Sequence, residues 1–258
     1  MYIYMGILCL LICLPLLWMY RRPAPTQNTT SSPTTHAPRQ ARFRDEIACS
    51  NPMRPLGMRP ATLQALLCMA GVACCVAMAM PQVHIVAYCG DLGFGLARGA
   101  EMLSAMLAMG IISRLLSGWV SDYIGGLRTL LLGSVLQGIA LLMFLNTTGL
   151  VSLYIVAALF GLFQGGIVPA YALIVREYFG PREAGERIGT VLMATLLGMA
   201  LGGWLPGIIY DLTGTYHAAF LNGTAWNLLN GGIVLFLLMR ARGGLRRELK
   251  TGEYGPHP

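Results

Sequence analysis

Apolar residues along this chain gather in seven runs, each separated from the next by polar or charged residues. A helix crosses a bilayer core with about 20 mostly apolar residues, and each run approaches or exceeds that length. The pattern therefore predicts an all-α integral membrane protein with seven transmembrane helices. The predicted spans cover residues 2–20, 61–89, 99–120, 128–146, 150–175, 188–210 and 218–239.

The composition of the chain supports the same class. Of its 258 residues, 55% are hydrophobic and 11% are charged, whereas an ordinary soluble domain carries about 25% charged residues. A chain this apolar is neither a soluble globule nor a disordered protein. The net charge of +7 fits the enrichment of basic residues on the cytoplasmic side of membrane proteins. No basic patch interleaved with aromatic residues indicates a nucleic acid as a partner.

The charges also predict an orientation. Arginine or lysine occurs in every second connection and in the tail, namely in residues 21–60, 121–128, 176–187 and 240–258. These basic segments all fall on one side of the predicted bilayer, which the charge rule assigns to the cytoplasm. The N-terminus is then outside and the C-terminus inside. Residues 21–60, rich in Thr, Ser and Pro, are predicted to be a disordered cytoplasmic linker, and 240–258 a cytoplasmic tail.

Two prolines inside the predicted spans indicate helix interruptions. Pro81 lies within 61–89, and Pro169 lies within 150–175. Proline kinks a helix, and such an interruption either serves packing or lines a transporter site. Small residues in these and other spans predict close approach of helix backbones. They are Gly161, Gly165, Gly198, Gly202 and Gly203.

Arg114 is the sharpest candidate for a binding residue because it lies inside a predicted span. Arginine in a bilayer costs at least a few kcal/mol unless it faces a cavity or has a partner. Its helix-face neighbours Gly110, Ser117 and Gly118 are small and leave room for an incoming anion. The guanidinium either binds a substrate anion through its bidentate fork or pairs with an acid such as Glu101.

A second motif lies in the connection between the third and fourth predicted spans. It runs from Gly118 through Asp122 to Gly125, with Arg128 following. Gly118 would allow close helix approach, Gly125 would allow a tight turn, and Asp122 is placed to cap a neighbouring helix N-terminus. This G-x-x-x-D-x-x-G spacing resembles the signature loop of the major facilitator superfamily of secondary transporters, which joins the second and third helices of each six-helix half.

The resemblance implies a fold for the whole chain. The span 2–20 corresponds to helix six of a facilitator, 21–60 to the loop between the halves, and 61–239 to the complete C-terminal half. By that count the first five helices are missing, so a complete cavity needs an N-terminal half or a second copy. The resemblance further implies secondary active transport by alternating access, and we expect a bacterial inner (plasma) membrane location.

Within the superfamily, the chain resembles the branch of monocarboxylate transporters and oxalate/formate antiporters. The matching stretches are 82–93, 114–118 and 176–180. In that branch an arginine at the position of Arg114 binds the substrate carboxylate. This implies a small organic anion as substrate, specifically a monocarboxylate, with a coupled proton as a further candidate partner. Three departures are Gly110, where monocarboxylate carriers often have an acid, the absence of lysine from 188–210, where oxalate exchangers use one, and Tyr123, where the signature loop usually has a basic residue.

Other polar residues within the spans are secondary candidates for substrate contact. They are Gln82 and His84 in the span 61–89 and Gln164 in the span 150–175. Asn227 and Asn230 share a helix face and are expected instead to hydrogen-bond between helices. The seven cysteines and four histidines form no metal-ligand pattern, so we expect no metal or cofactor and interpret the cysteines as packing residues.

Other functional classes stay open from the sequence. Seven spans with an outside N-terminus also describe a membrane receptor, although the signature loop and the proline-rich linker argue against one. A non-transporting fragment of a membrane protein is a further alternative. A membrane-embedded enzyme is disfavoured because the chain has no H-E-x-x-H or G-x-S-x-G motif and no paired intramembrane acids.

Overall fold

The computed structural model describes residues 55–147 and 149–251, all of which belong to the unit formed by residues 39–258. This part of the chain is helical, without strands. Its elements are η1 (Pro55–Gly57), α3 (Pro60–Asp91), α4 (Leu96–Ile124), α5 (Gly126–Asn146), α6 (Leu150–Gln164), α7 (Ile167–Tyr178), α8 (Pro181–Thr213) and α9 (Tyr216–Thr251). The predicted span 2–20 and most of the predicted linker lie outside the described residues.

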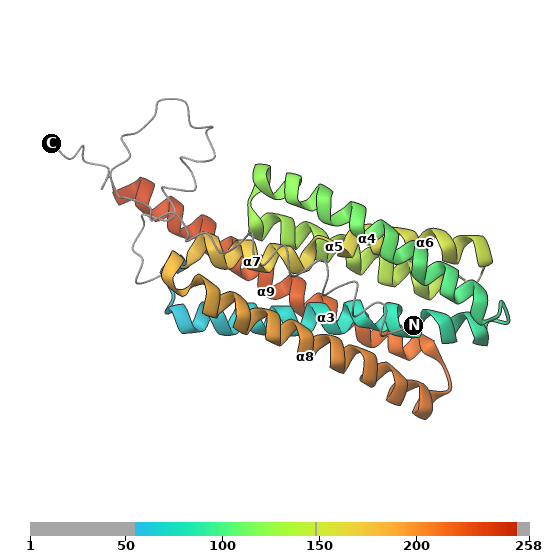
Figure 1. Cartoon of the computed structure of the whole chain (residues 1–258). Coiled ribbons are helices and arrows are strands. Elements are labelled where there is room, and N and C mark those ends of the chain that lie inside the picture. Colours follow the sequence, from blue (N-terminus) through green and yellow to red (C-terminus); the bar gives the residue numbers. More distant parts are fainter. Residues whose placement is uncertain (1–54, 148, 252–258) are drawn as a thin grey trace, which may run out of the picture. The chain divides into compact units, whose positions relative to one another are not determined.

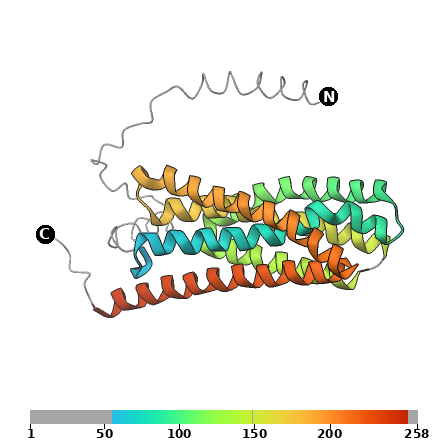
Figure 2. The same ribbon diagram turned by 90° about the horizontal axis from the view of Figure 1, so that it is seen from below.

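The helices run up and down through one bundle, with α6 and α7 following one another as a single rod (Figure 1). Helix α3 has the most extensive packing and lies chiefly against α8, α9 and α4. Helix α9 runs along the length of the bundle beside α3 (Figure 2). Helix α4 packs mainly on α6, and α5 packs mainly on α9 and α6.

Six helical segments in this part are long and apolar enough to cross a bilayer. They are Pro60–Asp91, Leu96–Ile124, Gly126–Asn146, Leu150–Tyr178, Glu183–Thr213 and Tyr216–Gly243. Each contains one predicted span, from 61–89 through 218–239, and extends it at one or both ends. The helices continue into polar residues at the membrane interface, where hydropathy falls although the backbone stays helical. The predicted all-helical membrane fold is confirmed for these six spans.

Pro81 and Pro169 differ in whether their helix is interrupted. Helix α3 continues from Pro60 to Asp91 with Pro81 inside it, so no interruption occurs there. The span 150–178 is interrupted, but the break lies at Gly165 and Gly166, before Pro169. Two consecutive glycines have weak helix propensity, and they separate α6 from α7.

Four of the five glycines that predict close helix approach lie against the backbone of a neighbouring helix. A Cβ at Gly161 would lie 2.0 Å from the carbonyl oxygen of Met106 on α4. A Cβ at Gly165 would lie 2.4 Å from the Gly110 carbonyl oxygen on α4. A Cβ at Gly198 or Gly202 would lie 2.5 or 2.4 Å, respectively, from a carbonyl oxygen of α3. At Gly203 the nearest atom would be 3.5 Å away, an ordinary contact. Glycine therefore sets the spacing of α4 on α6 and of α8 on α3.

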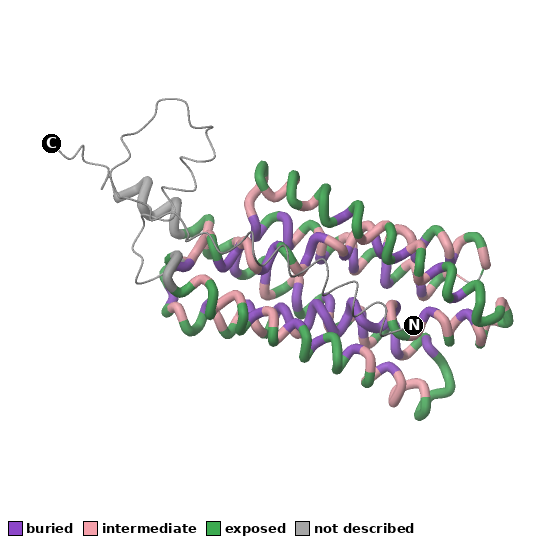
Figure 3. Tube along the Cα trace, in the orientation of Figure 1, coloured by how far each residue is buried: buried purple, intermediate pink, exposed green. Residues whose placement is uncertain are grey.

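Burial is uneven among the helices (Figure 3). Within the most apolar window of each span, 67% of α3 residues are buried, compared with 11% in α4 and 22% in α8. The buried residues of α4 are limited to Gly99, Met102, Met106 and Ser113. Most of the surface of α4 and of α8 is therefore left uncovered by the other described helices.

Polar side chains cross-link the interior of the bundle. Asn227 Nδ2 on α9 donates to Gln137 Oε1 on α5 at 3.2 Å. Asn230 Nδ2 donates to Ser134 Oγ at 3.0 Å, and the Tyr171 hydroxyl on α7 donates to Asn230 Oδ1 at 2.9 Å. All five residues are buried. The prediction that Asn227 and Asn230 bond between helices is confirmed.

The predicted charge asymmetry is present in the fold. One end of the bundle holds the start of α3, the α4–α5 and α7–α8 connections and the end of α9 (Figure 1). The arginines at this end include Arg59, Arg128, Arg176, Arg187, Arg240 and Arg242, which lie among the acids Asp122, Glu177, Glu183 and Glu186. The opposite end carries the acidic residues Asp91, Glu101 and Asp211 together with Arg98. The basic connections share one side, and their assignment to the cytoplasm stays a prediction.

The structure corrects the end of the predicted disordered linker 21–60. Pro55–Gly57 form the 3₁₀ helix η1, and Met58 is buried in the same apolar cluster as Leu63 and Leu67. Burial of this methionine anchors the chain before α3. The low sequence complexity upstream gives no sign of this anchor. The buried cysteines Cys74, Cys75 and Cys89 confirm the packing role expected of them.

Candidate functional site

Arg114 lies on a part of α4 that the other described helices leave exposed. The residues three, four and seven positions later are Ser117, Gly118 and Ser121, which share its face of the helix. The carbonyl oxygen of Arg114 accepts from Ser117 Oγ at 3.1 Å, but its guanidinium has no hydrogen-bond or ion-pair partner among the described residues. An unpaired guanidinium on a membrane-spanning helix needs either water or an anion at that face.

The neighbours of Arg114 divide into two groups. A Cβ at Gly165 would lie 2.4 Å from the Gly110 carbonyl oxygen, and one at Gly166 would lie 2.1 Å from Ser117 Cβ. Gly110 and Ser117 therefore pack against the α6–α7 rod, a correction to the expectation that they leave room for an anion. Around Gly118 a Cβ would meet no atom within 4 Å, so the close approach expected there is absent from the described part.

These contacts place Arg114 beside the break in the α6–α7 rod. Gly110 precedes it by one turn and meets Gly165, while Ser117 follows it by nearly one turn and meets Gly166. Arg114 is thus level with the two residues at which the rod is interrupted. In a membrane, a broken helix is tolerated where its freed backbone groups face protein or a watery cavity.

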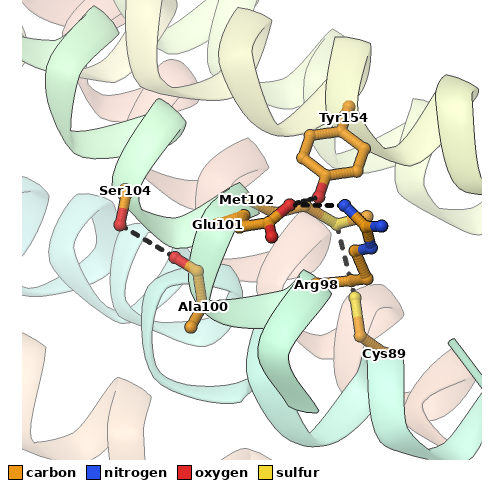
Figure 4. Close-up of polar contacts among 7 residues, drawn as sticks. All are labelled: Cys89, Arg98, Ala100, Glu101, Met102, Ser104 and Tyr154. Atoms are coloured by element: carbon orange, nitrogen blue, oxygen red, sulfur yellow. Dashed lines mark hydrogen bonds and ion pairs between the residues drawn. The ribbon is translucent and has the colours of Figure 1, made fainter. Parts of the chain in front are cut away.

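Glu101, the acid considered as a partner of Arg114, is engaged elsewhere (Figure 4). Its Oε2 accepts a hydrogen bond from Arg98 Nη1 at 3.0 Å and another from the Tyr154 hydroxyl on α6. Glu101 is also 13 residues from Arg114, about 20 Å along the helix axis. The interpretation of Arg114 as the ion-pair partner of Glu101 is therefore wrong.

The secondary candidates do not gather at one site with Arg114. His84 Nε2 on α3 donates to the Gly203 carbonyl oxygen on α8 at 2.9 Å, and Gln82 is half-buried on the same helix. Gln164 is only 3% exposed, and its Oε1 has no partner in the described part. It therefore lies in the interior of the described bundle, and its contact with a substrate stays a prediction.

The signature loop is a tight turn between α4 and α5. Gly125 adopts φ +82°, a conformation that favours glycine, so the predicted turn is confirmed. Asp122 and Arg128 are both exposed. The N-terminus of α5 is capped by a different acid, because the Gly126 amide donates to Glu177 Oε1 of α7 at 3.1 Å. No sequence pattern marks Glu177 beyond its place in the matched stretch 176–180.

Comparison with known proteins defines the class. The sequence profile of the Major Facilitator Superfamily matches residues 1–145 and 67–256 of this chain. The chain belongs to this superfamily and is an integral, multi-pass membrane protein. The predicted relationship to the superfamily is confirmed.

The similar proteins identify the branch. The chain is 31% identical over 160 residues to monocarboxylate transporter 13 of Rattus norvegicus, covering 61% of this chain and 37% of that protein. It is 29% identical over 182 residues to monocarboxylate transporter 10 of Mus musculus, covering 68% of this chain and 35% of that protein. The resemblance to the monocarboxylate-transporter branch is confirmed, and the chain spans little more than a third of these relatives.

A solved structure supports the fold independently. The crystal structure of the peptide transporter POT in complex with alafosfalin superposes with a TM-score of 0.65 at 20% identity, covering 76% of this chain and 42% of that one. At this identity the similarity concerns the fold alone. The described helices thus have the architecture of part of a facilitator, as the signature loop predicts.

Proposed function

We propose that this protein takes part in secondary active transport of a small organic anion, a monocarboxylate, by alternating access. Membership of the superfamily and similarity to the monocarboxylate transporters support the class. This function also fits the signature loop better than the receptor alternative does. A coupled proton is part of the proposal, and its carrier is not assigned.

The observation that carries the proposal is the isolation of Arg114. Its guanidinium lies on an exposed face of α4 without an acidic partner in the described part, and the nearest sequence candidate, Glu101, is held by Arg98 and Tyr154. A buried or membrane-embedded arginine persists only with a partner or water. A substrate carboxylate would supply that partner through two parallel hydrogen bonds.

The exposed faces of α4 and α8 support a second part of the proposal. Only 11% and 22% of their most apolar windows are buried among the described helices. We infer that a second half, either an N-terminal half or another copy of this chain, covers these faces and completes a cavity around Arg114. In this arrangement Gln82 and His84 remain candidate contacts on α3, and residues 118–128 face the cytoplasm as a gate.

The test removes the charge of Arg114 without changing the fold. We expect Arg114→Gln to abolish saturable uptake of short monocarboxylates by membranes that contain the protein, and Arg114→Lys to restore only part of it because lysine lacks the bidentate fork. Uptake of labelled lactate and pyruvate, with expression and melting temperature measured in parallel, provides the readout.

Arg242→Gln serves as the matched control because it removes one exposed arginine from the end of α9. This control should leave uptake unchanged. Normal uptake in a well-expressed Arg114→Gln protein would overturn the assignment of Arg114 and, with it, the main structural reason to propose an anionic substrate.

A further inference from the structure

A pocket of about 230 Å³ opens between α4, α5 and α7 near the signature loop. Helix α4 contributes Ser117, Gly118 and Ser121 to its lining, and α7 contributes Pro169 and Arg176. The three α4 residues follow Arg114 by three, four and seven positions, so the pocket lies on the face of α4 that also carries Arg114. The separation from Arg114 to Ser121 is about 10 Å along the helix axis.

The pocket lies beside the contact between α4 and the start of α7 at the helix break. A Cβ at Gly166 would lie 2.1 Å from Ser117 Cβ, so the two segments touch at this level. At Gly118, which points to a neighbouring side of α4, a Cβ would meet nothing within 4 Å. The contact therefore closes one end of the pocket beside Arg114, and the other end lies toward Arg176.

The charge of the pocket is positive. Arg176 is exposed and has no hydrogen-bond or ion-pair partner in the described part of the chain. None of the described residues that line the pocket is acidic. The neighbouring carboxylate of Glu177 accepts from the Gly126 amide, and Asp122 does not line the pocket. The Arg176 guanidinium is thus the charged group that a ligand would meet.

The other residues that line the pocket indicate which kind of ligand fits it. The hydroxyls of Ser117, Ser121 and Thr129 donate to backbone carbonyl oxygens at 3.1, 2.7 and 2.9 Å, so their protons are already used. The other lining residues include Pro169, Ala170, Ala172 and Leu173, which are small or apolar. A short apolar body with one anionic group fits such a pocket, since the only unused donors belong to Arg176.

We propose that this pocket is a second binding site for a short monocarboxylate, with Arg176 as the carboxylate ligand. The proposal rests on the proposed function and extends it. An anion that leaves Arg114 toward the basic end would meet a second guanidinium there. In the orientation that the charges predict, this is the cytoplasmic side, so the site would set the affinity for substrate in the cytosol.

The test measures the electrostatic field inside the pocket. Ser121→Cys is placed in the full chain after its native cysteines have been replaced, and inside-out vesicles are treated with sulfonate- or trimethylammonium-bearing methanethiosulfonates. A nearby unpaired guanidinium should favour the anionic reagent by about five- to tenfold over its relative rate at a Gly180→Cys control outside the pocket. Adding Arg176→Gln should remove this preference, while adding Arg242→Gln should leave it unchanged.

Occupancy by substrate is measured in the same vesicles. Sodium pyruvate at millimolar concentration should slow labelling of Ser121→Cys, sodium chloride should not, and Arg176→Gln should abolish the protection. An unchanged reagent preference after Arg176→Gln overturns the proposal. So does protection that depends on anionic phospholipid in the vesicles and not on pyruvate, because the occupant would then be a lipid headgroup.

The two proposals fail separately. Uptake that survives Arg114→Gln removes the proposed role of Arg114, whatever the labelling of the pocket shows. Pocket labelling that ignores Arg176 removes the second site even if Arg114→Gln abolishes uptake. Matched loss of cytosolic-side affinity after Arg176→Gln, with outside affinity retained, is the transport result expected when both proposals hold.

Discussion

For a single residue, Arg114, the sequence allows two alternative partners: a substrate anion or an acid such as Glu101. Hydrophobic periodicity places both residues in one span but does not show where each side chain bonds. The fold separates them, because Glu101 is shared by Arg98 one turn away and by Tyr154 on α6. A membrane arginine without such an acid is a stronger candidate for ligand binding than its position alone indicates.

The first residue-scale prediction concerns the independence of Arg114 and Glu101. In a double-mutant cycle of Arg114→Gln and Glu101→Gln, thermal stability should show a coupling energy within about 0.5 kcal/mol of zero, because the two groups share no partner. A parallel cycle of Glu101→Gln and Tyr154→Phe should show coupling of about 0.5–1.5 kcal/mol, the net value of a hydrogen bond. Coupling above about 1 kcal/mol between Arg114 and Glu101 would restore the ion-pair interpretation.

The second residue-scale prediction concerns Glu177. Its carboxylate accepts from the Gly126 amide at the start of α5, so Glu177→Ala should lower stability by about 1 kcal/mol through loss of a helix cap. Glu177→Gln retains an acceptor and should lose less. Thermal unfolding in detergent measures both, with exposed Glu186→Ala as the control. Equal melting temperatures for the Ala variants at 177 and 186 would contradict the capping role.

At the element scale, close backbone contact positions α4 on the α6–α7 rod. A Cβ at Gly161 would lie 2.0 Å from a backbone carbonyl oxygen of α4, which cannot move aside as a flexible side chain would. Gly161→Ala should therefore force α4 away from α6 and cost about 1–3 kcal/mol. Gly232→Ala is the matched control, because a Cβ there meets nothing within 4 Å and should be neutral or stabilising.

This prediction is measured by melting temperature and by monocarboxylate uptake. Gly161→Ala should lower both, since Arg114 lies on the helix that would be displaced. A Gly161→Ala protein as stable as Gly232→Ala would show that α4 does not contact α6 through this glycine.

Helix composition explains which parts of the fold were predictable. The six described spans and the close approach of helix backbones could be predicted from long apolar runs and from glycine spacing. Both signals depend on local composition. Periodicity did not show which face of a helix is buried, since α4 and α8 are apolar on nearly every side. For that reason the sequence predicts open space beside Gly110 and Ser117, whereas both residues contact the α6–α7 rod.

At the scale of the whole molecule, the fold gathers most of the described arginines at one end of the bundle, the basic end, and leaves Arg98 as the only described arginine at the other end. We predict that the basic end faces the cytoplasm. Single cysteines at Gly180 in the α7–α8 connection and at exposed Leu212 before the α8–α9 turn should react oppositely in intact cells. An impermeant maleimide should label Leu212→Cys from outside and Gly180→Cys only after permeabilisation. The reverse pattern would invert the orientation of the whole bundle.

The interior polar network has a consequence for how the protein is made. Helix α9 is synthesised last of the described helices, yet its Asn227 and Asn230 hydrogen-bond to Gln137 and Ser134 on α5 and to Tyr171 on α7. While α9 is still in the ribosome, these earlier helices sit in the insertion machinery or the lipid without these partners. Arrival of the final helix therefore completes the membrane-inserted fold, and nascent chains that stall before residue 216 should be retained by membrane chaperones or degraded.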